Sequence, residues 1–162
     1  MNYKIIDNFL DKESYNQLTN LVLNKSFNWF YAPEQVIGTG DLPYHYHTFY
    51  NKGKSNSDFS NQIKLIFIDK LDHSSILNCR VNLSVNRNVI GQGSKHTDTN
   101  GKHKTAIYYY NTNNGGTKLF LDDEIFVSSK ENRLLIFDSN IQHCAVYHND
   151  TEYRIVINTN YF

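Results

Sequence analysis

Two segments in the first half of the chain place apolar residues at helical spacing. The first runs from Asp11, whose carboxylate can cap a helix, to about Lys25. The second begins at Ser57, another residue suited to an N-cap. Their apolar faces are formed by Tyr15, Leu18 and Val22, and by Phe59, Ile63, Ile66, Phe67 and Leu71. A helix with one apolar face packs against another layer, so we expect both helices to cover a sheet.

The segment between these helices, Phe30 to Ser55, is punctuated by turn-forming residues. It holds Pro33, Pro43, Gly38, Gly40 and Gly53. Such residues mark turns and loops, and a short strand is predicted around Tyr46–Tyr50. Loops carried on a rigid scaffold often form the mouth of a substrate site.

From Ile76 onward the pattern changes to short runs of β-branched and aromatic residues, separated by Asn, Gly, Asp and Ser clusters. The predicted strands are Ile76–Asn86, Lys104–Asn111, Thr117–Leu121, Ile125–Val127, Leu134–Phe137, His143–Tyr147 and Glu152–Asn160. Helices followed by many short strands predict an α+β chain that is mainly β. We expect one domain, with an N-terminal helical cover over about residues 1–75 and a double-stranded β-helix (jelly-roll) core over about residues 76–162.

Composition narrows the function classes. The chain has 162 residues, a length typical of one domain, and its 16 basic and 16 acidic residues cancel. A neutral chain without basic runs argues against nucleic-acid binding. The start of the chain, Met1–Asp7, lacks the basic start and the long apolar stretch of a signal peptide, and no apolar stretch is long enough to cross a bilayer. We therefore expect a cytoplasmic protein with no membrane partner, whose Cys79 and Cys144 are free thiols.

His96-Thr97-Asp98 is the most informative tripeptide. Residues i and i+2 of an extended segment point to the same side, so one imidazole and one carboxylate can bind a single ion. His143, at the start of a later apolar strand, is the candidate third ligand. Two histidines and one carboxylate leave coordination positions open, the arrangement associated with non-haem Fe(II) oxygenases. Taken alone, H-x-D also fits solvated loop residues.

Arg154 adds a second feature, because it lies inside the apolar run Tyr153–Ile157. Burying an unpaired charge is costly, and a carboxylate-bearing ligand would offset this cost through a bidentate contact with the guanidinium. The alternatives are an edge-strand arginine that reaches solvent, or a structural ion pair.

The sequence gives less reason to assign a metal-binding role to the other histidines. His45 and His47 face the same side of the predicted short strand but have no acidic or thiol ligand at suitable spacing, so aromatic packing or a place at the substrate mouth is favoured over a second metal site. His103 and His148 fall in turn segments and are predicted to be surface residues.

Together these residues resemble the Fe(II)/2-oxoglutarate-dependent dioxygenase family, and in particular its prolyl-hydroxylase branch. The resemblance covers about Val81 to Phe162, roughly half of the chain. It is carried by His96-Thr97-Asp98, Ile107-Tyr108-Tyr109-Tyr110-Asn111, Gly115-Gly116-Thr117, Arg133-Leu134-Leu135-Ile136-Phe137, His143, Arg154 and Tyr161-Phe162.

The resemblance implies that His96, Asp98 and His143 bind Fe(II) at the open end of the jelly-roll. It implies that Arg154 and the Tyr109 hydroxyl bind the distal carboxylate of 2-oxoglutarate, with O2 as the second co-substrate and succinate and CO2 as products. A core aromatic with an ordinary partner is the alternative for Tyr109. The iron and co-substrate would carry the chemistry, and no side chain beyond the metal ligands need be catalytic.

The chain departs from the family at Asn86, in a region where the family commonly has a tyrosine upstream of H-x-D. Asn82 is the alternative polar residue that could take the place of this tyrosine in the wall of the co-substrate site.

A prolyl or other peptidyl side chain is the substrate that the resemblance favours, with a small molecule as the other possibility. The oligomeric state is left open. A non-enzymatic jelly-roll binding module and a zinc or manganese cupin do not explain Arg154, and a halogenase-like relative would need a small residue in place of Asp98.

Overall fold

The computed structural model describes residues 3–98 and 101–162. Its helices are α1 (Lys12–Val22), α2 (Ser60–Ile66) and the 3-10 turn η1 (Ile68–Lys70). None of the helices within the described residues is long and apolar enough to span a membrane. The strands are β1 (Tyr3–Asp7), β2 (Phe30–Ala32), β3 (Tyr44–Asn51), β4 (Lys54–Ser55), β5 (Ile76–Val85), β6 (Lys104–Tyr109), β7 (Gly116–Phe120), β8 (Glu124–Ser128), β9 (Arg133–Asp138), β10 (Gln142–Val146) and β11 (Tyr153–Tyr161).

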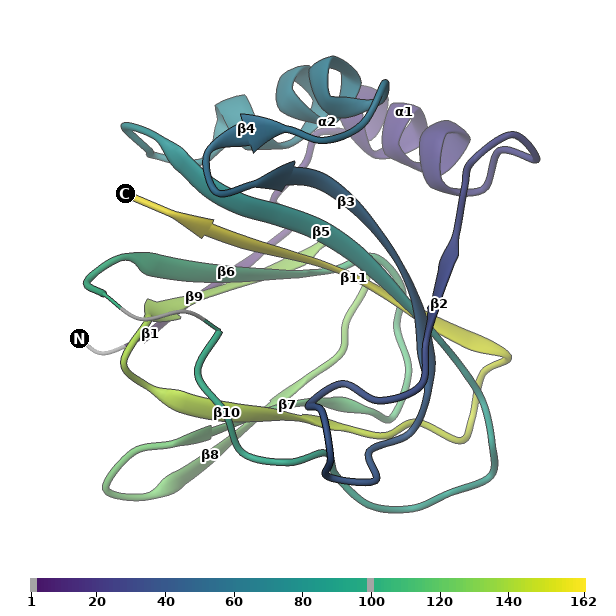
Figure 1. The fold of residues 1–162 in the computed structure, drawn as a ribbon, viewed down its shortest axis with the longest axis vertical. Helices are drawn as coiled ribbons and strands as arrows, with labels where there is room; N and C mark the ends of the chain where they lie inside the picture. The colour runs from purple at the N-terminus through teal and green to yellow at the C-terminus, as the bar shows by residue number, and fades with distance from the viewer. Residues whose placement is uncertain (1–2, 99–100) are drawn as a thin grey trace.

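In the described part of the chain the strands form two antiparallel sheets. The larger has the order β1-β9-β6-β11-β5-β3-β2, with β4 paired to β3, and the smaller has the order β10-β7-β8. Figure 1 shows three layers: α1 and α2 above the large sheet, and the small sheet facing it from below. The predicted fold class, a jelly-roll core with N-terminal packing helices, is confirmed.

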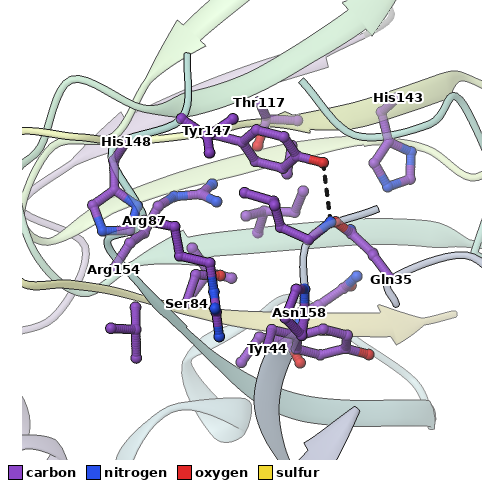
Figure 2. A pocket seen from close by; sticks show the side chains of 18 residues that line it. Gln35, Tyr44, Ser84, Arg87, Thr117, His143, Tyr147, His148, Arg154 and Asn158 are labelled. Atoms are coloured by element: carbon purple, nitrogen blue, oxygen red, sulfur yellow. Dashed lines mark hydrogen bonds between the residues drawn. The ribbon is translucent and has the colours of Figure 1, made fainter. Parts of the chain in front are cut away.

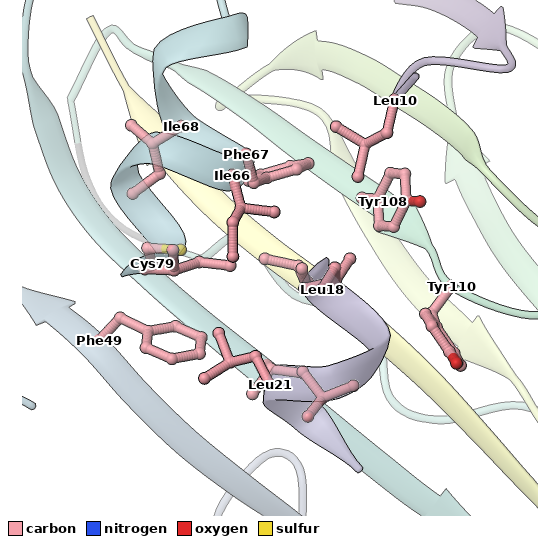
Figure 3. Close-up of a cluster of buried hydrophobic side chains, with 14 of the residues drawn as sticks. Leu10, Leu18, Leu21, Phe49, Ile66, Phe67, Ile68, Cys79, Tyr108 and Tyr110 are labelled. Carbon is pink, nitrogen blue, oxygen red and sulfur yellow. The ribbon is translucent and has the colours of Figure 1, made fainter. Parts of the chain in front are cut away.

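Alternate residues of β11 contribute side chains to two different clusters, one on each face of the large sheet. Ile155 and Ile157 belong to the cluster of buried side chains under the helices, which also contains Leu18, Ile63 and Phe67 (Figure 3). Val156 faces the other way, into a second cluster between the two sheets. Because successive side chains of a strand point to opposite faces, Arg154, Asn158 and Asn160 also lie on the Val156 side. The interior between the sheets is therefore polar at both ends of this strand.

Both helices end or begin differently from the prediction. Asp11 does cap α1, accepting a hydrogen bond from the Ser14 amide (2.8 Å), but α1 ends at Val22 and not near Lys25. The prediction that Ser57 caps the second helix is wrong, because α2 begins at Ser60. The Ser57 hydroxyl instead accepts from the Phe59 amide (3.0 Å) within the preceding turn.

The sequence did not predict β1. This strand pairs with β9, with Tyr3 opposite Phe137 and Asp7 opposite Arg133. The Arg133 guanidinium donates to both carboxylate oxygens of Asp7 at 2.7 and 3.1 Å, and these contacts hold the pKa of Asp7 well below its usual range. The N-terminal segment thus extends the large sheet, in addition to the predicted helical cover.

The prediction that His103 and His148 are surface residues is also wrong. The two side chains are 7% and 5% exposed. His103 precedes β6. Its backbone amide donates to the Ser139 hydroxyl oxygen in the neighbouring turn (3.2 Å), and its ring packs edge-on against Phe162. His148 follows β10 in a segment that folds back over the interior, so a turn conformation did not imply exposure.

Candidate metal and co-substrate site

The structure brings His96, Asp98 and His143 together at one end of the space between the sheets. Their ligand atoms all lie within 4.8 Å of one another, and they are the one such group of three or more potential metal ligands found in residues 3–98 and 101–162. Asp98 Oδ1 lies 3.7 Å from His96 Nε2 and 3.5 Å from His143 Nε2. Ligand atoms about 2.0–2.2 Å from a shared ion are roughly 3–4 Å apart, so this donor set fits a divalent transition metal.

Backbone pairing fixes the two histidines relative to each other. The His96 amide donates to the His143 carbonyl (3.0 Å) and the His143 amide donates to the His96 carbonyl (2.9 Å). The two rings are 4.6 Å apart. This isolated antiparallel bridge joins the segment before β6 to β10, although the residues are far apart in the sequence.

The hydrogen bonds of each imidazole leave one nitrogen available to a metal. Nδ1 of His96 lies 3.0 Å from the Ser94 carbonyl and Nδ1 of His143 lies 3.3 Å from the Ile141 carbonyl. A carbonyl can only accept, so each Nδ1 carries the proton and each Nε2 keeps its lone pair. Burial also lowers the pKa of His96, which favours the neutral ring that binds metals.

Asp41 supports this arrangement from the segment before β3. Its Oδ1 accepts from the Ser94 amide (2.9 Å) and the Ser94 hydroxyl (3.0 Å), and so holds the carbonyl to which His96 donates. This contact could not be predicted from the sequence, because Asp41 and Ser94 are far apart along the chain.

Asp98 is held as a carboxylate by partners on β11. Burial by itself would raise the pKa of Asp98, but His143 and then the amides of Asn160 and Asn158 keep it well below its usual range. Both asparagine Nδ2 groups donate to Oδ2 at 3.0 Å. Oδ1, the oxygen nearest the two histidines, is thereby left for an ion.

Arg154 is buried and short of partners. It is 6% exposed, its Nη2 donates to the Gly116 carbonyl (2.9 Å), and its Nε has no hydrogen-bond partner among the described residues. Burial lowers the pKa of Arg154, and the Tyr109 ring 5.8 Å from the guanidinium carbon only partly opposes this effect. The edge-strand alternative is therefore wrong, because β11 lies between β5 and β6 in the sheet.

Two further buried polar atoms lie near this guanidinium. The Tyr109 hydroxyl and Nε2 of His148 make no hydrogen bond of ordinary geometry within the described residues. Burial raises the pKa of Tyr109 to about 12, against the opposing influence of Arg154 and of the nearby Thr117 hydroxyl. Burial and then the positive charge of Arg154 lower the pKa of His148.

One cavity extends from His143, one of the three candidate metal ligands, to Arg154 and His148. His143, Thr117, His148 and Arg154 all line it, and in Figure 2 His148 and Arg154 lie on one side of the view and His143 on the other. Asn82 contributes to the same wall, with a buried Oδ1 that lacks a hydrogen bond among the described residues. Asn86 lies beyond the end of β5, where its Oδ1 accepts from the Asn88 amide (2.8 Å).

His45 and His47 are not part of a metal-binding group in the described structure. Both ring nitrogens of His47 are already within hydrogen-bond distance of protein atoms, the Asn28 carbonyl (2.7 Å) and the Ser57 hydroxyl (2.6 Å). The His47 ring packs against Phe27 and Phe49. The aromatic-packing interpretation is confirmed.

No family model and no curated protein matches the chain. Its fold is similar to that of solved 2-oxoglutarate/Fe(II) oxygenases. A Burkholderia pseudomallei oxidoreductase of the 2OG-Fe(II) oxygenase family is 8% identical, with a TM-score of 0.75 over 99% of this chain and 84% of that chain. A Trichoplax adhaerens prolyl hydroxylase, solved with a hypoxia-inducible-factor peptide, is 17% identical, with a TM-score of 0.68 over 99% and 83%. SnoK, an alpha-ketoglutarate-dependent carbocyclase from nogalamycin biosynthesis, is 10% identical, with a TM-score of 0.70 over 99% and 79%.

Proposed function

We propose that this chain is an Fe(II)- and 2-oxoglutarate-dependent oxygenase that hydroxylates a C–H bond and releases succinate and CO2. The observation that carries the proposal is a two-histidine, one-carboxylate set whose His143 lines the same cavity as Arg154, a buried arginine that has no acidic partner among the described residues. Similarity of fold to known oxygenases supports the same conclusion. The chemistry itself rests on the site, because one fold can serve many activities.

His96, Asp98 and His143 would hold the iron. Their Nε2, Oδ1 and Nε2 atoms are the ones that the surrounding hydrogen bonds leave free. When bound, the iron would couple the oxidative decarboxylation of 2-oxoglutarate to the insertion of one oxygen atom of O2 into the substrate.

Arg154 would hold the distal carboxylate of 2-oxoglutarate. Its Nε and the Tyr109 hydroxyl are buried donors with unused hydrogen-bonding capacity, and a carboxylate is the group that a guanidinium binds with two parallel hydrogen bonds. The His148 Nε2 is a further polar contact for the same group, which the sequence did not suggest. Apolar residues of the cavity, Ile107 and Val156, would exclude water from the bound co-substrate.

A binding experiment tests this proposal. Anaerobic calorimetry should find one Fe(II) per chain and one 2-oxoglutarate that binds tightly only when the metal is present. In air, the loaded protein should then convert 2-oxoglutarate to succinate, slowly without substrate and faster with it. A protein that binds the metal but no 2-oxoglutarate would instead be a metal-binding jelly-roll module without this chemistry.

Two substrate classes fit this proposal. The similarity to a prolyl hydroxylase solved with a peptide supports a prolyl or other peptidyl side chain, and the similarity to a carbocyclase of small-molecule biosynthesis supports a small molecule. The surface beside Asp98 bears on the choice between them.

A further inference from the structure

A second groove lies on the Asp98 side of the metal-ligand set. It is separate from the cavity of Arg154, but the two share Asn158, so they meet beside the metal ligands. Its wall includes Tyr46, Thr48, Arg80 and Asn160 as well as Asp98. If 2-oxoglutarate occupies the Arg154 cavity, this groove offers the substrate a separate approach to the metal ligands.

The groove is lined mostly by polar side chains, with Arg80 as the cation of its wall. Arg80 on β5 is directly opposite Asn158 on β11, and the Asn158 amide donates to Asp98 Oδ2 (3.0 Å). Side chains of directly opposed residues start about 5 Å apart, so Arg80 is about one side-chain length from the metal ligand. A substrate bound to Arg80 would therefore present carbon atoms near the metal.

Arg80 is oriented but not neutralised. Its guanidinium carbon lies 5.9 Å from the Tyr44 ring centre and 5.6 Å from that of Tyr46, so two aromatic rings hold the side chain against β3. Within residues 3–98 and 101–162 no acidic side chain forms an ion pair with it. The one carboxylate of the groove, Asp98, already accepts from two asparagine amides.

We propose that Arg80 binds a carboxylate of the substrate, and that the substrate is a small organic acid or free amino acid and not an internal residue of a peptide. This inference rests on the proposed function and specifies its substrate class. A single guanidinium beside Asp98 suits a monoanionic carboxylate better than a phosphate dianion, which needs more positive charge. An internal prolyl residue has no charged group to pair with Arg80 and would favour an apolar groove.

Equilibrium binding tests the inference without relying on turnover. The protein is loaded with Mn(II), which replaces iron without its redox chemistry, and with saturating 2-oxoglutarate. Free L-amino acids, including L-proline, are then titrated by calorimetry, each beside its carboxamide and its capped N-acetyl-N′-methylamide. We expect at least one free acid to bind about ten- to a hundred-fold more tightly than its carboxamide and its capped form, both of which lack the carboxylate; this is the range for a hydrogen-bonded charged pair.

Variants assign the preference to Arg80. In Arg80→Gln the advantage of the acid over its amide should fall below about threefold, and Arg80→Lys should restore part of it. Lys54→Gln is the matched control, because it removes a positive charge from the exposed strand β4, next to β3 but outside the groove, and should leave the preference intact.

Two results would overturn this inference and leave the proposed function standing. In the first, 2-oxoglutarate binds normally but no acid binds more tightly than its amide and its capped form. In the second, the preference for the acid survives in Arg80→Gln. Wild-type protein that binds Mn(II) but no 2-oxoglutarate would overturn the proposed function, and this inference with it.

Discussion

Replacing Arg154 with leucine separates a co-substrate role from a structural one. Arg154 is almost fully buried, and its one hydrogen bond within the described structure is to the Gly116 carbonyl. Among the described residues no acidic side chain pairs with Arg154, so removing its buried charge relieves a desolvation cost, whereas the lost hydrogen bond costs about 1 kcal/mol. The free energy of unfolding of the protein without ligands should therefore fall by no more than about 1.5 kcal/mol.

Binding of 2-oxoglutarate should respond far more strongly to the same change. Removing one partner of a desolvated, bidentate charge pair costs on the order of 2–5 kcal/mol, which is roughly 30- to several-thousand-fold in affinity. Tyr109→Phe should cost about 0.5–1.5 kcal/mol for one hydrogen bond. The double variant should lose less than the sum, because both groups would contact one carboxylate.

The assay is an anaerobic calorimetric titration of 2-oxoglutarate into the iron-loaded variants. Metal affinity, measured separately, should stay close to wild type in Arg154→Leu. Arg87→Leu is the matched control: Arg87 lines the same cavity but is exposed, so its loss should cost at most about 1 kcal/mol. If Arg154→Leu binds 2-oxoglutarate as tightly as wild type, the co-substrate assignment fails.

Three further predictions concern the metal, the fold and the thiols. His143→Ala should weaken Fe(II) binding by more than about 100-fold in a metal titration. Loss of a metal ligand should have a larger effect than the 10- to 100-fold loss caused by removing a residue that only hydrogen-bonds to a ligand. Unchanged affinity would contradict the assignment of His143 as the third ligand. Gly116→Ala should destabilise the protein by about 1–3 kcal/mol in urea, because an added Cβ would lie 2.3 Å from the Val127 carbonyl oxygen; an unchanged midpoint would refute this close approach. Cys79 and Cys144 are both free and buried, and burial raises the pKa of Cys79 to about 12. A thiol reagent should therefore label neither cysteine rapidly in the native protein and both after unfolding. Rapid labelling of the native protein would count against their burial.

Most of the strands could be predicted because their signal is local. Runs such as Ile76–Asn86 and Lys104–Asn111 carry enough β-branched and aromatic residues to mark β5 and β6 within two residues of their ends. β1 also contains aromatic and β-branched residues (Tyr3, Ile5 and Ile6), but five residues are too few to distinguish a strand from other structure, and this strand pairs with β9, more than a hundred residues later. Tertiary pairing of this kind leaves little trace in a short local sequence.

In the candidate site, too, some residues could be predicted from the local sequence and others depend on tertiary contacts. Asn158 and Asn160 could have been recognised, because they are four and six residues after Arg154 and share its face of a strand with a period of two. His148 could not, since a turn prediction does not reveal whether the turn folds over the interior. Asp41 was equally hidden, because its contact with Ser94 depends on how two distant loops meet.

The central strand β11 links the stability of the fold to the geometry of the site. One of its faces carries Ile155 and Ile157 into the core beneath the helices, and the other carries Arg154 and the asparagines that hold Asp98. At about 3.3 Å per residue, Arg154 and Asn158 are roughly 13 Å apart along the strand, and Asn158 lines both the cavity of Arg154 and the groove beside Asp98. β11 is hydrogen-bonded to β5 along one edge and to β6 along the other, so its backbone is held on both sides. The co-substrate and metal-site roles proposed above would require precise placement of the side chains on β11, and a doubly paired strand provides it better than a loop.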